Sequence, residues 1–129
     1  MTANRKLALG LLIGIVIGIA GATAIRARQA RTAPGYIIAE VEVTDRDAFQ
    51  KYGAKVPETL APFNHQYIIR GGKTISLEGE PPRGIIMIAF DSVEKAQAWY
   101  ESPAYSAIKP MRLNSARSRI FIAEGVTPK

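Results

Sequence analysis

The segment that most restricts the fold is Gly84–Phe90, GIIMIAF, because it predicts a strand that is apolar on both faces. Alternate residues of a strand point to opposite faces. One face therefore carries Ile86, Ile88 and Phe90, and the other carries Ile85, Met87 and Ala89. A strand of this kind lies inside a sheet and is covered on both sides. Since 129 residues fit one domain, we expect it at the centre of a single sheet.

Three other segments have strand character. Tyr36–Val43 alternates a core face with a mixed face. His65–Arg70 is a second strand, and Gly71-Gly72 after it predicts a hairpin-type turn, because glycine adopts positive φ without strain. We expect Lys73–Leu77 to pair back briefly. The last strand is predicted at Arg119–Glu124.

The first helix is predicted between the first two strands. Thr44 and Asp47 stand at the spacing of a capping box, which predicts a helix from about Arg46 to Ala54. Its buried stripe would hold Phe49, Tyr52 and Val56. Proline lacks the backbone N–H that a helix interior needs, so we expect Pro57 to interrupt this helix before one further turn.

The second helical region begins after the capping pair Asp91-Ser92. It restarts at Ser102-Pro103, with serine as the cap and proline at the first helical position. Pro110 is expected to kink the second piece.

The order of elements is thus β-α-β-β-α-β, which predicts an α+β fold of the ferredoxin-like kind: an antiparallel sheet with two helical segments on one face. The other face keeps apolar residues such as Tyr36 and Ile38. Because exposed apolar faces of this kind bind partners, we expect a homodimer that packs sheet against sheet.

The first 25 residues differ from the rest in hydropathy. Leu7–Ile25 is an uncharged run of 19 residues that follows Arg5 and Lys6. As a helix it would span about 28 Å, close to the thickness of a bilayer's hydrocarbon core. We therefore predict that residues 1–25 are a signal peptide or membrane anchor, 26–35 a linker, 36–126 the folded domain and 127–129 a tail.

Three interpretations of this leader stay open. The pattern Ala22-Thr23-Ala24 favours a secretory signal that is cleaved after Ala24. An uncleaved anchor at the cell membrane is favoured by a face of small residues and by the bases that follow the run; these are Gly10, Gly14, Gly18, Arg26, Arg28 and Arg31. The third is a soluble cytoplasmic protein. The first two predict an exported, periplasmic or membrane-anchored protein.

Composition excludes several classes of function. The chain has no cysteine and one histidine, which excludes disulfides, thiolate nucleophiles and multi-histidine metal sites. The net charge is +6, but residues 1–35 hold five of the 17 bases and none of the 11 acids. The rest of the chain is therefore nearly neutral, which argues against nucleic acid as a partner.

The domain resembles the domain of unknown function 1330 family from Gly35 to Val126. The residues that carry the resemblance are GYIIAEVEVTD from Gly35, Arg70-Gly71-Gly72, Leu77-Glu78-Gly79, AQAWYESPAYSAI from Ala96, Arg112 and Ala123-Glu124-Gly125-Val126. The resemblance implies a dimeric α/β barrel of the ferredoxin-like superfamily. It implies no established activity, and the cofactor is unknown.

The densest group of aromatic and polar residues is a candidate ligand site, because ring faces and hydroxyl groups together can hold a planar ligand. Arginine would supply an anion partner. The candidates are Arg70, Glu78, Trp99, Tyr100, Ser102, Tyr105 and Arg112. Helix-to-sheet packing and structural ion pairs are the alternative explanation. The hairpin turn is expected to bring Arg70 and Glu78 together near Trp99.

Two smaller features have simpler explanations. His65 could act as an acid–base group or bind haem iron, but a histidine at a strand start that contacts a backbone group accounts for it. Glu78 and Glu80 could hold a cation, although a solvated loop accounts for them equally.

Two functions remain open at this stage. The chain could be an exported or anchored homodimer that binds a small molecule, with oxygenase- or isomerase-like chemistry by analogy of fold alone. It could instead be a non-catalytic envelope or stress-associated protein. A lined cavity that holds Arg70, Glu78 and Trp99 together would favour the first, and a barrel filled by Ile, Met and Phe would favour the second.

Overall fold

The computed structural model describes residues 32–129, and a compact unit spans Ala33–Thr127. The predictions for the leader therefore lie outside the described residues. Within the part described, no helix is both long enough and apolar enough to span a bilayer.

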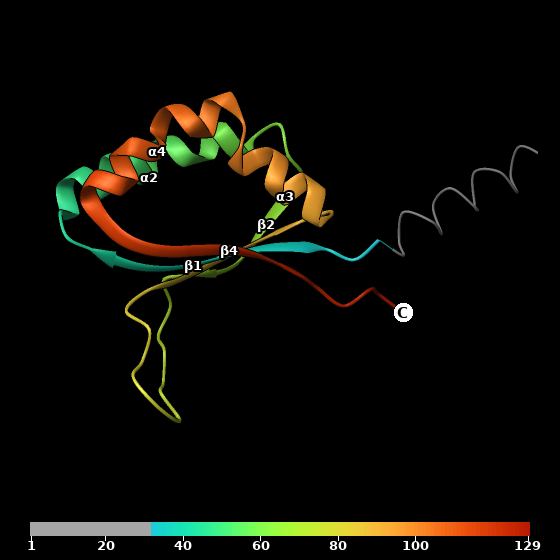
Figure 1. Ribbon diagram of the computed structural model, residues 1–129, viewed down its shortest axis with the longest axis horizontal. Coiled ribbons are helices and arrows are strands. Elements are labelled where there is room, and N and C mark those ends of the chain that lie inside the picture. Colours follow the sequence, from blue (N-terminus) through green and yellow to red (C-terminus); the bar gives the residue numbers. More distant parts are fainter. Residues whose placement is uncertain (1–31) are drawn as a thin grey trace, which may run out of the picture. The chain divides into compact units, whose positions relative to one another are not determined.

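The elements follow the predicted order. Residues 32–129 form four strands, which are β1 (Gly35–Val43), β2 (His65–Arg70), β3 (Ile85–Phe90) and β4 (Ala116–Glu124). The same described region has three helices, which are α2 (Arg46–Leu60), α3 (Val93–Tyr100) and α4 (Pro103–Ser115). The strands form one antiparallel sheet in the order β2-β3-β1-β4, with the helices on one face (Figure 1). The α+β, ferredoxin-like prediction is confirmed.

The alternation in β1 decides which residues form the core. Ile37, Ala39 and Val41 are buried under the helices, and the residues between them are half-buried on the opposite face. We call that opposite face, which no helix covers, the open face (Figure 1). Antiparallel pairing joins its apolar residues into one row across all four strands. This row consists of Ile69, Met87, Ile38 and Phe121.

Three predictions about the helices and the last strand were wrong. Helix α2 runs without a break through Pro57, because its buried face, which includes Tyr52 and Leu60, holds the helix against the core. Its N-cap is Asp45, whose side chain accepts a hydrogen bond from the backbone N–H of Ala48 at 3.1 Å, so the Thr44–Asp47 capping box does not form. Strand β4 begins at Ala116, directly after α4, and not at Arg119.

The turn after β2 opens into a loop of residues 71–84, which leaves the sheet on the side away from the helices (Figure 1). Gly71 has φ of 66°, as expected for glycine, and its N–H donates to the Ile85 carbonyl at 2.8 Å. The predicted pairing of Lys73–Leu77 does not occur. Without a strand beside them, Ile75 and Leu77 stay exposed, Leu77 at 92%.

Candidate functional site

A small cavity lies between the helices and the face of the sheet that they cover. Its volume is about 60 Å³. The walls are aliphatic and aromatic, with a few polar groups that converge on one side; they include Ile37, Phe49, Tyr52, Tyr67, Ile86, Ile88, Trp99, Tyr100, Tyr105, Arg112 and Ile120. We call this space the interior cavity.

Aromatic rings from two helices and the sheet build one wall of the interior cavity. Trp99 of α3 stacks on Phe90 of β3, with ring centroids 5.7 Å apart. The Trp99 ring also lies 4.3 Å from that of Tyr105 in α4. Its indole N–H donates to the Thr59 hydroxyl at 3.0 Å. These contacts hold the Trp99 ring between the sheet and α4.

The polar side of the cavity is a network centred on Tyr105. Its hydroxyl lies 2.8 Å from that of Tyr52 in α2. Arg112 lies about two turns further along α4 than Tyr105. It donates from Nε to the Tyr105 oxygen at 3.2 Å and from Nη1 to the Ser118 hydroxyl at 2.8 Å. The network therefore joins α2, α4 and β4.

Arg112 is the charged residue that the fold buries most deeply among those described, at 5% exposed. Burial alone would lower its pKa, but the oxygens of Tyr105 and Tyr52 hold the pKa of Arg112 above its ordinary value. Burial and the Tyr105 hydroxyl raise the pKa of Tyr52. At neutral pH the cavity thus holds the guanidinium cation of Arg112 and the neutral phenol of Tyr52.

The predicted site residues divide into two groups. Trp99, Tyr100, Tyr105 and Arg112 all line the interior cavity, so the sequence grouped them correctly in space. Ser102 is the N-cap of α4, where its hydroxyl accepts from the Tyr105 N–H at 3.2 Å and donates to the Trp99 carbonyl at 2.7 Å. Whether any of these residues binds a ligand stays a prediction.

Arg70 and Glu78 do not form the expected pair. Arg70 lies at the end of β2 with its guanidinium 4.6 Å from the centre of the Tyr67 ring. Glu78 is exposed on the loop that points away from the helices, whereas Trp99 lies in α3 on the other side of the sheet (Figure 1). Both ion pairs within residues 32–129 involve other residues. The expected position of Arg70 and Glu78 together beside Trp99 was wrong.

His65 has the structural position that the simpler explanation gave it. Its Nδ1 lies 2.7 Å from the Phe63 carbonyl at the start of β2. Within residues 32–129 no group of three or more acidic or histidine side chains is placed to hold a metal ion, and Glu78 and Glu80 are both exposed.

Sequence reasoning missed Tyr52 and Tyr67 as members of the cavity wall. Tyr52 was assigned to the core stripe of the first helix, and its hydroxyl was not given a role. A buried tyrosine usually finds a hydrogen-bond partner, so a phenol within a core stripe was the available signal.

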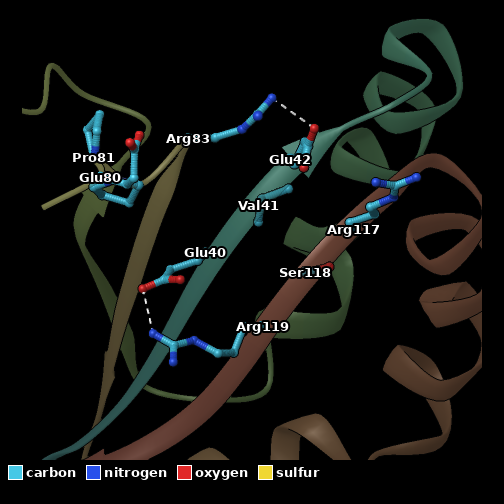
Figure 2. Close-up of a pocket in the computed structure, with 10 residues that line it drawn as sticks. Glu40, Val41, Glu42, Glu80, Pro81, Arg83, Arg117, Ser118 and Arg119 are labelled. Atoms are coloured by element: carbon cyan, nitrogen blue, oxygen red, sulfur yellow. Dashed lines mark hydrogen bonds and ion pairs between the residues drawn. The ribbon is translucent and has the colours of Figure 1, made fainter.

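Sequence reasoning also missed a groove on the open face, with a volume of about 600 Å³ (Figure 2). Glu40 and Glu42 of β1 form its floor beside Arg119 of β4, and the loop supplies Arg83. The Arg119–Glu40 and Arg83–Glu42 pairs measure 2.8 and 2.9 Å. We call it the charged groove. Its charges are largely neutralised by each other.

The fold and cavity define a ferredoxin-like α+β protein with a small cavity between its sheet and its helices. The family described as "Domain of unknown function (DUF1330)" matches residues 34–126, and the chain belongs to that family. The resemblance inferred from the sequence is confirmed to this extent.

Solved structures agree on the fold. A protein of unknown function from Rhodopseudomonas palustris is 16% identical, with a TM-score of 0.61 over 81% of this chain and 94% of that one. A dimeric ferredoxin-like protein of unknown function from Thermobifida fusca is 11% identical, with a TM-score of 0.51 over 73% and 92%. At these identities the likeness shows the fold alone. A search of curated proteins found no match.

Proposed function

We propose that this protein binds a small molecule in the interior cavity of each chain and works as a homodimer. The observation that carries the proposal is the cavity itself: apolar rings and aliphatic side chains surround a few convergent polar groups. This combination is typical of ligand sites, in which apolar walls supply affinity and polar groups set orientation. Four of the residues predicted from the sequence contribute to it.

Native mass spectrometry of the full chain, purified from its own host, tests the binding. We expect a retained small molecule on the wild type and its loss on Tyr105→Trp, because a larger side chain fills the space. Ile108→Val, a conservative change of a buried α4 residue that does not line the cavity, is the matched control and should retain the molecule. Spectra of the wild type without any added mass would contradict the proposal.

The dimer is proposed to form through the open face. The apolar row of Ile69, Met87, Ile38 and Phe121 crosses the whole sheet without a covering helix. Burial of such a row would contribute roughly 25 cal/mol per Å² of apolar surface. The Thermobifida fusca structure, a dimer by its description, supports a homodimer but does not specify the face.

Replacing Ile38 with Asp tests the dimer. A carboxylate in the middle of the apolar row would be buried without a partner, which costs several kcal/mol. We expect Ile38→Asp to sediment as a monomer at micromolar concentration. Leu113→Asp, on the exposed side of α4, is the matched control and should stay dimeric. A monomeric wild type would contradict the proposal.

The same apolar row favours a second candidate function, that of a non-catalytic envelope or stress-associated protein with the dimer as a scaffold. A sheet-to-sheet interface filled by Ile, Met and Phe would have little room for a ligand. The interior cavity lies within one chain, so its occupancy distinguishes the two functions: a scaffold would leave it to water.

We further propose export or membrane anchoring, supported by the uncharged run Leu7–Ile25 and the bases on both sides of it. Fractionation of the native host is the test. We expect either a chain shortened by 24 residues in the periplasm or the full chain in the membrane. Full-length protein free in the cytoplasm would contradict both versions.

A further inference from the structure

We propose that the ligand of the interior cavity is a compact organic monoanion, a small carboxylate, held by Arg112. The inference rests on the proposed binding function and adds the chemical class of the ligand. It follows from three properties of the described residues: an unmatched charge, an excess of hydrogen-bond donors and the size of the cavity.

The charge of Arg112 is unmatched. A guanidinium stays protonated at any physiological pH, and this one is buried. Within residues 32–129, no carboxylate lies within 4 Å of it, and both ion pairs of this region use exposed arginines on the open face. Its partners, the hydroxyls of Tyr105 and Ser118, are neutral. Because an uncompensated buried charge is unfavourable, an anion that enters the cavity is attracted to it.

The network also has more donors than acceptors. Tyr52 and Tyr105 bring two hydroxyl protons, but the single hydrogen bond between their oxygens uses only one. Arg112 occupies a lone pair of Tyr105 through Nε. One phenolic proton is therefore left over, and Nη2 of Arg112 makes no hydrogen bond to any described residue. Every fully buried side-chain nitrogen and oxygen of residues 32–129 has at least one hydrogen-bond partner, so these two donors are spare capacity and not orphaned groups. A carboxylate has two acceptor oxygens that match them.

Several other polar groups near the cavity already have hydrogen-bond partners. The Trp99 indole donates to Thr59, and Thr59 donates to the Val56 carbonyl at 2.7 Å. Ser115 donates to the Met111 carbonyl at 2.6 Å. Arg112, Tyr105 and Tyr52 are joined by hydrogen bonds on one side of the cavity, while most of the other lining residues are aliphatic or aromatic. A ligand with one charged end and one apolar end matches this division.

The volume limits the ligand to a few heavy atoms. A water needs at least about 10–15 Å³ on this measure, so about 60 Å³ holds a few waters or an anion the size of acetate. Typical sites for larger ligands measure about 300–1,000 Å³. One cation also favours a monoanion over a dianion, because the second charge would be buried without a partner.

A cationic side chain lies over the ring of each half-buried tyrosine in the cavity wall. Arg70 lies 4.6 Å from the centre of the Tyr67 ring, and the Lys109 ammonium lies 4.8 Å from that of Tyr100. These positive charges increase the local concentration of anions near the cavity. The sequence predicted Arg70 as a direct anion partner. In this proposal Arg70 instead attracts the anion from outside the cavity.

Calorimetric titration of the full chain with acetate and with acetamide, its neutral isostere, tests the class of ligand. We expect acetate to bind at least tenfold more tightly than acetamide. Arg112→Met should lose this preference, and Arg112→Lys should keep part of it because the charge remains. Arg119→Met removes an exposed arginine of the charged groove and should behave as the wild type. Thermal melts with and without acetate provide a second measurement, in which only chains with a cation at position 112 gain stability.

Each other outcome is decisive. Equal binding of acetamide and acetate overturns the monoanion but leaves a small-molecule site. If chloride binds as tightly as acetate, the inference that the ligand is an organic anion is overturned. If Arg112→Met lowers the melting temperature equally with and without acetate, and the wild type binds neither probe, Arg112 is structural and the inference fails. The proposed function fails as well only if native mass spectrometry also detects no retained molecule on the wild type.

Discussion

The interior cavity and the charged groove hold arginines in opposite settings. In the groove, Arg83 and Arg119 are exposed and each pairs with a carboxylate (Figure 2). In the cavity, Arg112 is buried and its partners are hydroxyls. Water screens the groove's charges, so their pairing contributes little free energy. The buried charge cannot rely on water, so the hydrogen bonds around it fix the positions of its neighbours.

This difference indicates where a ligand would change the molecule most. An anion in the charged groove would compete with Glu40 and Glu42 for arginines that are already paired. An anion in the interior cavity would complete a network that has an unmet charge. The larger groove is therefore the weaker candidate, although its volume is about ten times that of the cavity.

The largest effect is expected from Tyr105→Phe. The change removes the hydroxyl that accepts from Arg112 and contacts Tyr52, and it leaves two buried polar groups without that partner. The loss of such a partner costs about 1–3 kcal/mol of unfolding free energy. Urea denaturation measures it. Tyr100→Phe, whose hydroxyl makes no hydrogen bond to the described residues, is the control and should change stability by less than about 0.5 kcal/mol.

If Tyr105→Phe is as stable as the wild type, the contrast between a buried cavity network and an exposed groove does not hold. That result would mean that Arg112 and Tyr52 find water in place of the lost hydroxyl, and that the cavity behaves as a solvated surface.

Alkaline pH should act on the interior through Tyr52. Burial raises the pKa of Tyr52 above that of the unfolded chain, where tyrosine ionises near pH 10. Above about pH 10 the unfolded state loses this proton while the folded state keeps it. The free energy of unfolding then falls by about 1.4 kcal/mol per pH unit through this group, and it is unaffected at lower pH.

Denaturation curves between pH 9 and 11, on the scale of ordinary tyrosine ionisation, test this effect. Tyr52→Phe should make the decline less steep, because one of the two tyrosines whose pKa is raised by burial is gone and only Tyr67 remains. Phe49→Leu alters a neighbouring ring without a titratable group and should keep the slope. An identical slope for the wild type and Tyr52→Phe would show that the Tyr52 hydroxyl ionises equally well in both states.

The fold was predictable because its strands follow simple periodicity. Burial alternates along β1 as its sequence alternates, and β3 is apolar on both faces. The length of α2 was not predictable from Pro57, because packing of Tyr52 and Leu60 outweighs the single hydrogen bond that proline removes. The loop 71–84 was misjudged for the opposite reason: strand-like residues such as Ile75 find no neighbouring strand to pair with.

The site was predictable only where its members are close in sequence. Trp99, Tyr100 and Tyr105 stand within one helical region, so their clustering could be seen directly. The contact between Tyr52 and Tyr105 depends on the packing of α2 against α4, which no local pattern determines. The predicted pairing of Arg70 with Glu78 was wrong because it required the loop to fold back as a hairpin.

The smallest effect is expected in the charged groove. Arg119 and Glu40 are 71% and 38% exposed in their side chains, so their pair should contribute about 0–1 kcal/mol. A double-mutant cycle with Arg119→Ala and Glu40→Ala measures the coupling energy. Added salt should reduce it, because ions screen exposed charges. A coupling energy of about 1.5 kcal/mol or more would instead be typical of charge pairs buried in an interface. That result would place the charged groove under the partner chain. The arginines of both sites would then be buried, and the two sites would differ only in whether the arginine pairs with a carboxylate.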